Sequence, residues 1–160
     1  MTTSPSGLLT SQSQGPRQLF PDLQRPSGNP VRSTGGFALR GKKILLVEDD
    51  EDIQRFVSRL MELEGADLTV CGSAEQGEAE MVRQAFDLVL LDVNLPGRPG
   101  WDLLAATPEQ GPTCPIIVFT ASVNPEYEQK AFALGAAGFI TKPVGARELV
   151  EQLKSYLTLD

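Results

Sequence analysis

The stretch Ile44-Leu45-Leu46-Val47-Glu48-Asp49-Asp50-Glu51-Asp52-Ile53, residues 44–53, decides the fold of this 160-residue chain. It opens with four consecutive apolar residues, the pattern of a short strand that is buried on both faces. Five acidic residues follow, and apolar residues then recur with the spacing of one helix face, at Ile53, Phe56, Val57, Leu60 and Met61. A buried strand that leads directly into an amphipathic helix is typical of a sheet whose strands run parallel.

The same order of strand and helix repeats four more times along the chain. Apolar runs predict further strands at 68–71, 88–91, 116–119 and 138–140. The helices predicted after them are one that starts at a capping box of Ser73 and Gln76, one over Trp101–Ala106 that Pro108 ends, one over Pro125–Leu134, and one that includes Leu149–Leu157. Five such units predict an α/β fold, a flavodoxin-like doubly wound parallel sheet of strand order 2-1-3-4-5 with five helices. A barrel of eight units would need roughly 250 residues.

The first 38 residues differ in composition from the rest of the chain. Up to Lys43 the chain holds six Lys or Arg residues against one acid, 5 of the 12 prolines, and no sustained apolar periodicity. Such a segment cannot bury enough apolar surface to offset its loss of conformational entropy. We therefore expect residues 1–38 to form a disordered basic tail and residues 39–160 to form the domain. The tail is an inert extension, or a segment that docks electrostatically on an acidic partner or on the chain's own domain. Its richness in Ser and Arg and its low content of acids also resemble an organelle transit peptide.

Charge and composition exclude several classes of function. The net charge of −7 divides into +5 for residues 1–43 and −12 for residues 44–160, which argues against direct binding of nucleic acid. No run of 18 apolar residues predicts a membrane-spanning helix. Cys71 and Cys114 are too few for a disulfide scaffold, so we expect free thiols and a cytoplasmic protein. The chain has no histidine, which excludes histidine as a general base, a metal ligand or a phosphorylated group on this chain.

Polar residues stand where the predicted strands end. The first strand runs into Glu48 and Asp49, the third into Asp92, the fourth into Thr120 and the fifth into Lys142. Because ligands of open parallel sheets bind beyond the carboxyl ends of the strands, we expect these side chains around one crevice. Clustered carboxylates without His or Cys suit a hard cation, Mg²⁺ before Zn²⁺. A carboxylate beside such a cation can attack phosphorus and form an acyl phosphate.

Four runs of the sequence together resemble the receiver domain of two-component response regulators: ILLVEDDEDI (44–53), LVLLDVNLPGRPG (88–100), IIVFTAS (116–122) and GFITKPV (138–144). The resemblance covers nearly all of residues 42–158, with the motifs in the family's order and spacing. It implies that Asp92 is the phosphoacceptor and that a cis peptide bond precedes Pro143. It further implies Mg²⁺ ligands in Glu48, Asp49, Asp92 and the backbone carbonyl of Asn94, a switch hydroxyl in Thr120, an active-site lysine in Lys142 and an aromatic switch position in Phe139.

The resemblance also implies a function in phosphorelay signalling. A histidine kinase or a histidine-containing phosphotransfer protein would supply the phosphoryl group. The face built by the fourth helix, the fifth strand and the last helix would then change its preference for a downstream partner. The sequence does not name this partner. We expect a phosphoacceptor switch with slow autophosphatase activity at most, not an enzyme, and a regulator of one domain that resembles the chemotaxis regulators. The acidic pair is Glu-Asp here, and the longer Glu48 is expected to reach the metal through water. Asn94 and Ser122 stand at positions that tune dephosphorylation in the family.

Three alternatives remain at this point. A phosphatase of the haloacid-dehalogenase kind also uses Asp, Thr, Lys and Mg²⁺ on a parallel sheet, but it needs a second Asp where this chain has Asn94, and usually a cap insertion. A flavodoxin needs a Ser/Thr/Gly phosphate loop after the first strand, where five acids would repel the flavin phosphate. A receiver without output, which acts as a phosphate sink or scaffold, has the same motifs.

Overall fold

Five parallel strands form one sheet in the computed structural model, which describes residues 37–110 and 114–157. The strands stand in the order β2-β1-β3-β4-β5, as the sequence predicts. Their registers place Val47 beside Cys71 and Leu91, and Leu91 beside Val118, so the carboxyl ends of the central strands lie level. The strands are β1 (Lys43–Val47), β2 (Asp67–Cys71), β3 (Leu88–Leu91), β4 (Ile116–Thr120) and β5 (Gly138–Thr141).

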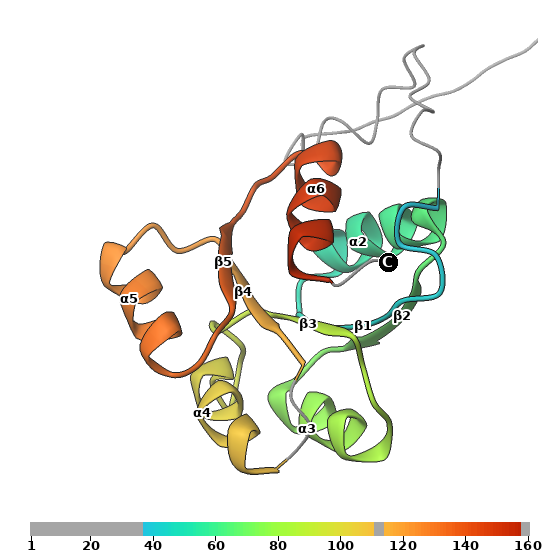
Figure 1. Cartoon of the computed structure of the whole chain (residues 1–160). Helices are drawn as coiled ribbons and strands as arrows, with labels where there is room; N and C mark the ends of the chain where they lie inside the picture. The colour runs from blue at the N-terminus through green and yellow to red at the C-terminus, as the bar shows by residue number, and fades with distance from the viewer. Residues whose placement is uncertain (1–36, 111–113, 158–160) are drawn as a thin grey trace, which may run out of the picture.

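Helices cover both faces of the sheet (Figure 1). Two of them, α2 (Glu51–Glu64) and α6 (Ala146–Tyr156), pack on one face against residues such as Ile44 and Leu46. The other three, α3 (Ala74–Arg83), α4 (Gly100–Gln110) and α5 (Pro125–Ala133), pack on the opposite face against Leu45 and Val47. Neighbouring residues of β1 therefore serve two separate cores, which explains why the strand is a continuous apolar run.

An acidic side chain and a hydroxyl side chain cap the N-termini of the helices that follow β1 and β2. Asp50 caps α2, because its Oδ1 accepts from the backbone N–H groups of Asp52 and Ile53 at 2.8 and 3.3 Å. Ser73 caps α3 by accepting from the backbone N–H of Gln76 at 3.2 Å. The Gln76 side chain reaches back to the N–H of Gly72, one residue earlier than in the usual capping box. The caps fix where each chain segment turns away from the carboxyl edge of the sheet.

A short turn before β1 belongs to the domain, and we call residues 37–42 the clasp. The clasp lies against the turn between α2 and β2: the N–H groups of Leu39 and Gly41 donate to the carbonyls of Glu64 and Gly65, both at 3.0 Å. The Leu39 side chain is fully buried in the core between the sheet, α2 and α6. Gly65 has a φ of +83°, and a Cβ there would come within 2.9 Å of the Phe37 ring. Close packing with the clasp therefore adds to the conformational reason for glycine at this position.

The described residues test some boundary predictions and leave others open. The expected disordered tail, residues 1–38, lies outside the described residues except for Phe37 and Ala38, and remains a prediction for the rest. The prediction that Pro108 ends the third helix is wrong, because this helix, α4, continues to Gln110. Proline lacks the N–H of one helical hydrogen bond, but its φ near −65° is itself helical. Cys71 and Cys114 are free thiols, as predicted. Within the described part no helix is both long and apolar enough to cross a bilayer.

Candidate functional site

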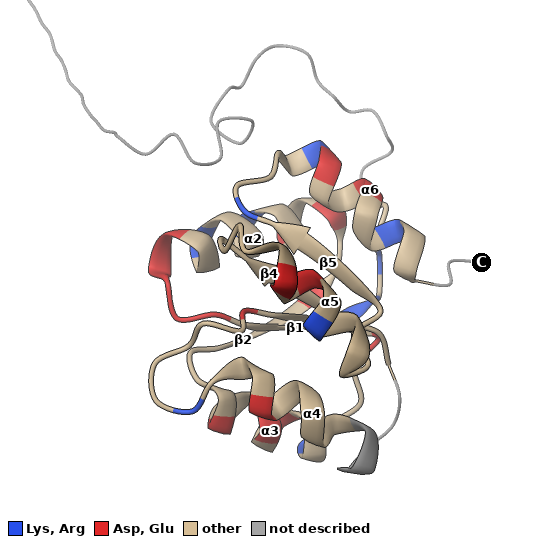
Figure 2. Cartoon of the chain, turned by 90° about the vertical axis from the view of Figure 1, so that its left-hand side faces the viewer, with Lys and Arg blue, Asp and Glu red and all other residues tan. Residues whose placement is uncertain are grey.

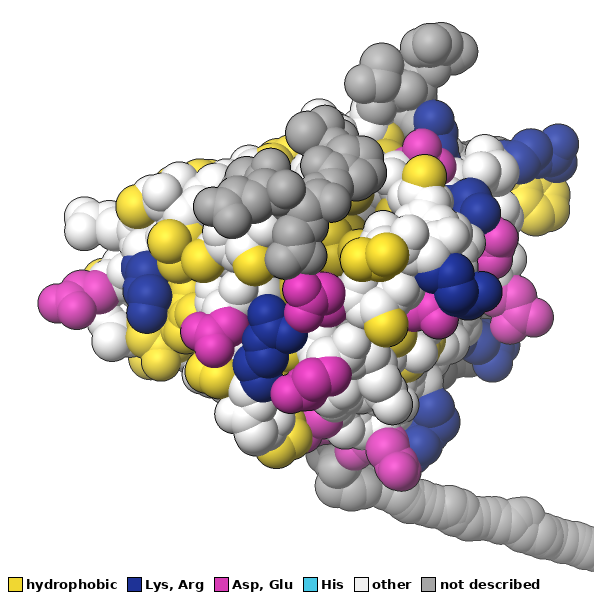
Figure 3. Space-filling view, turned by 90° about the horizontal axis from the view of Figure 1, so that it is seen from below, with side chains coloured by type: hydrophobic (Ala, Val, Ile, Leu, Met, Phe, Trp, Pro, Cys, Tyr) yellow, Lys and Arg dark blue, Asp and Glu magenta, His cyan; other side chains and the backbone are white. Residues whose placement is uncertain are grey.

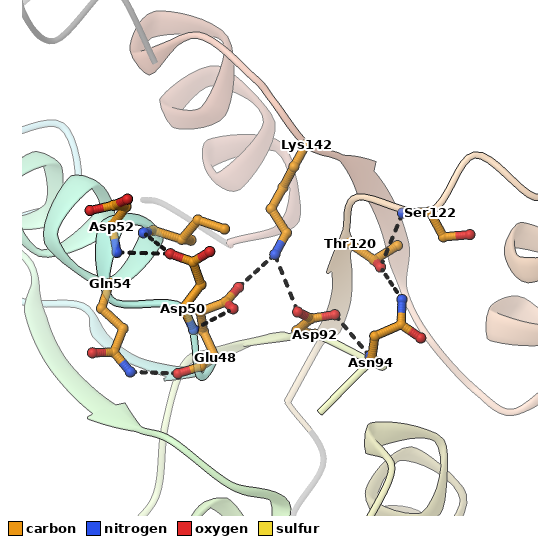
Figure 4. A network of polar contacts seen from close by, with 10 residues as sticks. Glu48, Asp50, Asp52, Gln54, Asp92, Asn94, Thr120, Ser122 and Lys142 are labelled. Carbon is orange, nitrogen blue, oxygen red and sulfur yellow. Dashed lines mark hydrogen bonds and ion pairs between the residues drawn. The ribbon is translucent and has the colours of Figure 1, made fainter. Parts of the chain in front are cut away.

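The carboxyl edge of the sheet brings together side chains that stand far apart in the sequence (Figure 4). Glu48 follows β1 directly and Asp92 follows β3, while Thr120 is the last residue of β4. Lys142 follows β5, after which the Lys142–Pro143 peptide bond is cis, as the resemblance implies. Figure 2 shows the acidic segment between β1 and α2 as a run of red at this edge. The predicted convergence at one edge is confirmed for these four positions.

Lys142 joins two buried carboxylates at the centre of this site. Its Nζ lies 2.6 Å from Oε1 of Glu48 and 3.3 Å from Oδ2 of Asp92. The three side chains are 6%, 1% and 9% exposed, respectively, so water screens their charges poorly. The ring of Phe119 lies beneath the ammonium group, with its centroid 5.1 Å from Nζ. One cation therefore compensates two buried anions from different strands.

Burial and charge act in opposite directions on Glu48. Loss of water around this side chain raises the pKa of Glu48 above its usual range, while the hydrogen bond and charge of Lys142 hold that pKa down. The N–H of Asp50 also donates to Oε2 of Glu48, at 3.0 Å. Gln54 donates from Nε2 to the Glu48 carbonyl oxygen at 2.6 Å and fixes the backbone at the start of the acidic segment. Both carboxylate oxygens of Glu48 thus already accept a hydrogen bond from the protein.

Three carboxylates lie close enough to share a cation. Oxygens of Glu48, Asp49 and Asp92 lie within 4.8 Å of one another. Asp49 is exposed, whereas Glu48 and Asp92 are buried. The N–H of Asn94 donates to Oδ1 of Asp92 at 2.9 Å and so orients the Asp92 carboxylate toward the other two carboxylates. An all-oxygen donor set of this charge fits a hard divalent cation such as Mg²⁺.

The Thr120 hydroxyl stands beside Asp92 and is held by two donors. Nδ2 of Asn94 donates to Oγ1 of Thr120 at 3.3 Å, and the N–H of Ser122 donates to the same atom at 3.4 Å. Thr120 is fully buried. Because its oxygen accepts from both neighbours, its own O–H is available to donate to a further group. The sequence did not predict the contact from the Asn94 side chain, since nothing in the spacing of the two residues signals it.

A tight loop after β3 determines where the Asp92 backbone lies. Gly100 starts α4, and its N–H donates to the Val93 carbonyl at 3.1 Å. A Cβ on Gly100 would overlap the Asp92 carbonyl oxygen and would lie 2.8 Å from the Cα of Val93. Only glycine therefore allows the first turn of α4 to pack on the backbone of Asp92. Phe139 of β5 lies apart from the polar network, half-buried against the core under α3, α4 and α5.

Comparison with known proteins adds an independent line of argument. The family model described as response regulator receiver domain matches residues 44–154. The chain is 36% identical over 109 residues to the response regulator protein FleR of Pseudomonas aeruginosa, covering 68% of this chain and 23% of that protein. It is 34% identical over 119 residues to the phosphate regulon transcriptional regulatory protein PhoB of the same organism, covering 73% of this chain and 52% of that protein. The chain thus spans only about a quarter to a half of the length of these curated relatives.

Solved structures agree with the fold. A CheY-like response regulator receiver domain protein from Methanospirillum hungatei superimposes with a TM-score of 0.68 at 31% identity, covering 72% of this chain and 92% of that one. The chemotaxis protein CheY4 of Vibrio cholerae gives a TM-score of 0.68 at 27% identity, covering 73% of this chain and 99% of that one. None of these matches supports the phosphatase alternative, whose second catalytic Asp is replaced by Asn94.

Proposed function

Because the chain belongs to the receiver-domain family of two-component response regulators, we propose that Asp92 accepts a phosphoryl group and that Thr120 converts this event into a change of partner binding. One observation carries the proposal. The buried Asp92 carboxylate lies between the ammonium group of Lys142 and the backbone N–H of Asn94, with the carboxylates of Glu48 and Asp49 next to it. No other group of three such ligands occurs within the described residues.

The transfer step follows from this placement. A carboxylate oxygen of Asp92 attacks phosphorus and forms an O–P bond, while the bond from phosphorus to the imidazole nitrogen of the donor breaks and its electron pair stays on that nitrogen. Because Nζ of Lys142 lies 3.3 Å from Oδ2 of Asp92, it would reach the oxygens of a phosphoryl group on Asp92 and could move from Glu48 toward the added charge. The donor histidine lies outside these 160 residues, which contain none. A histidine kinase or a histidine phosphotransfer protein would carry it.

Glu48, Asp49, Asp92 and the carbonyl of Asn94 are the groups proposed to hold Mg²⁺. Lys142 lies closer to Glu48, at 2.6 Å, than to Asp92, at 3.3 Å, and Asp50 donates to the second oxygen of Glu48, so Asp49 and Asp92 are the better direct ligands, with Glu48 acting through water. Mg²⁺ at this place would neutralise the charge that repels an incoming phosphate and polarise the phosphoryl oxygens. The residues themselves align Asp92 and exclude bulk water from it, since its side chain is only 9% exposed.

Thr120 is proposed to report the phosphorylated state. Its free O–H can donate to a phosphoryl oxygen on Asp92, which would draw the hydroxyl away from Asn94 and Ser122. Phe139 of β5 could then turn toward the space that Thr120 leaves. The face formed by α5, β5 and α6 would thereby change its affinity for a partner, as a shift between two populated states. Slow hydrolysis of the acyl phosphate by this chain belongs to the same proposal.

Phosphorylation by a small donor tests the assignment of Asp92. With Mg²⁺ and acetyl phosphate we expect the full chain to gain one phosphoryl group, measured by intact mass. Asp92→Asn should gain none, because an amide oxygen is a poor nucleophile, whereas the exposed Asp67→Asn at the start of β2 should behave as the unmodified chain does. Equal labelling of Asp92→Asn would overturn the assignment.

A further inference from the structure

An ion pair between a loop and a neighbouring helix stands outside the site. Nη1 of Arg98, in the loop between β3 and α4, lies 2.5 Å from Oε1 of Glu78 on α3. The two side chains are 25% and 29% exposed, unlike the other arginine pairs of the described residues, which involve an arginine that is 67% exposed. Arg98 and Glu78 are 20 positions apart in the sequence, so the pair joins two elements.

The helix that carries Glu78 packs closely against its neighbours. Gly77 precedes Glu78, and a Cβ at Gly77 would lie 2.8 Å from Cγ2 of Val47 and 3.3 Å from Cδ2 of Leu103. The backbone of α3 therefore touches both β1 and α4, with no room for movement toward the sheet. Val47 is the residue directly before Glu48 of the site. The same helix thus contacts the strand that leads into the acidic segment.

The loop held by Arg98 carries groups of the site. It leaves β3 through Asp92 and Asn94, and it ends at Gly100, which packs on the backbone of Asp92 and Val93. Between the buried residues Leu95 and Gly100, Arg98 is the one residue of four whose side chain is not exposed. Its ion pair with Glu78 therefore joins the middle of this loop to α3.

Acidic side chains surround the guanidinium of Arg98. Glu78, Asp102 and Glu75 all raise the pKa of Arg98, and the largest cause is the hydrogen bond that Arg98 donates to Glu78. Figure 3 views the molecule from the side of α3 and α4 and shows basic side chains close beside acidic ones on this face. The positive charge of Arg98 therefore interacts with acidic residues of both neighbouring helices, Glu75 and Glu78 of α3 and Asp102 of α4.

We propose that Arg98 is a positioning residue, which ties the loop after β3 to α3 and so sets the place of the Asn94 carbonyl relative to Asp49 and Asp92. The proposal rests on the proposed Mg²⁺ site and identifies what holds one of its ligands. Mg²⁺ demands nearly octahedral geometry, so a ligand on a loosened loop weakens binding. The contribution of Arg98 then appears in the affinity for Mg²⁺ rather than in the fold.

Calorimetric titration of the full chain with MgCl₂ measures the affinity for Mg²⁺ and tests this role. We expect Arg98→Ala to weaken Mg²⁺ binding about tenfold, the lower end for residues that support a metal ligand. Arg98→Lys should keep most of the affinity, because a cation at this position still faces Glu78, Asp102 and Glu75. The matched control is Arg83→Ala, which removes the pair with Glu80 within α3 and should leave the affinity unchanged.

The outcomes separate this inference from the proposed function. At saturating Mg²⁺, Arg98→Ala should be labelled by acetyl phosphate as fully as the unmodified chain, since Asp92 itself is intact. Three outcomes would overturn the role of Arg98 while Mg²⁺ binding by the unmodified chain stands. They are an unchanged Mg²⁺ affinity in Arg98→Ala, an equal loss of affinity in Arg83→Ala, and a loss in Arg98→Lys as large as that in Arg98→Ala. Absence of Mg²⁺ binding in the unmodified chain would overturn the metal site and this inference with it.

Discussion

Replacement of Lys142 by Met removes the single cation from the centre of the site. Methionine has nearly the same length and keeps the contact with the Phe119 ring, so the change is mainly one of charge. Glu48 and Asp92 then face each other without compensation, in a place where their side chains are 1% and 9% exposed. We expect the free energy of unfolding to fall because the folded state alone must bury these two charges.

The size of the loss follows from the geometry. Removal of one partner from a buried ion pair costs about 3–5 kcal/mol. Asp92 retains some contact with solvent and with the Asn94 N–H, so we expect the lower end, about 3 kcal/mol. With a denaturant slope of about 2 kcal/mol/M, the urea midpoint at pH 7.5 falls by about 1.5 M.

The loss should depend on pH and on Mg²⁺. Burial raises the pKa of Glu48, and without the opposing charge of Lys142 this pKa rises further. A carboxyl group with a raised pKa in the folded state destabilises the fold above that pKa, and the penalty disappears as pH falls toward the ordinary value. The difference in the free energy of unfolding between Lys142→Met and the unmodified chain should therefore be smaller at pH 5 than at pH 7.5. Addition of Mg²⁺ at pH 7.5 should reduce this difference as well.

Urea unfolding followed by circular dichroism measures these differences. Lys154→Met is the matched control, because its pair with Glu151 has a distance of 3.4 Å and side chains that are 37% and 63% exposed. Such a surface pair contributes about 0–1 kcal/mol, so its midpoint should move little at either pH. An equal loss for Lys142→Met at pH 5 and 7.5, insensitive to Mg²⁺, would refute the electrostatic reasoning and point to lost packing instead.

Three further predictions concern the clasp, the loop and the switch. Leu39→Ala should lower the free energy of unfolding by about 2–5 kcal/mol, whereas Leu63→Ala, at a leucine that is 51% exposed, should change it little; equal effects would show that the clasp does not belong to the core. Gly100→Ala should slow labelling by acetyl phosphate by at least about tenfold, since a misplaced reacting group loses rate steeply. Gly72→Ala, where a Cβ would make only ordinary contacts at 3.9 and 4.0 Å, should not slow it; equal rates would contradict the close packing on Asp92. Thr120→Ala should accept phosphate but lose the change in partner affinity, measured by pull-down with and without beryllofluoride; an unaltered response would remove Thr120 from the switch.

Much of the site was predictable because it depends on strand ends. In a parallel sheet every strand delivers its last residue to the same edge, so Glu48, Asp92, Thr120 and Lys142 could be brought together without knowledge of any distance. The order of the strands followed in the same way from five repeats of strand and helix. These predictions used only local patterns and one general rule of topology.

Contacts between loops and helices were not predictable by the same means. Arg98 stands in the run of residues 88–100 and Glu78 in a predicted helix, but neither pattern indicates that the two side chains meet. Only the packing of α3 beside α4 brings them to 2.5 Å. Leu39 lies outside the family match and was recognised only as the start of the domain, although it is fully buried. The helix beyond Pro108 was missed because proline was given more weight as a terminator than its helical φ justifies.

The clasp also determines how the domain can be joined to a fluorophore, a surface linker or a fused protein. It places Phe37 at the edge of the sheet where β1 begins, while Glu48 follows the end of the same strand. The five residues of β1, at about 3.3 Å each, put roughly 16 Å between the two edges. A fluorophore, a surface linker or a fused protein joined directly ahead of Phe37 would therefore be anchored away from Asp92 and leave that edge open.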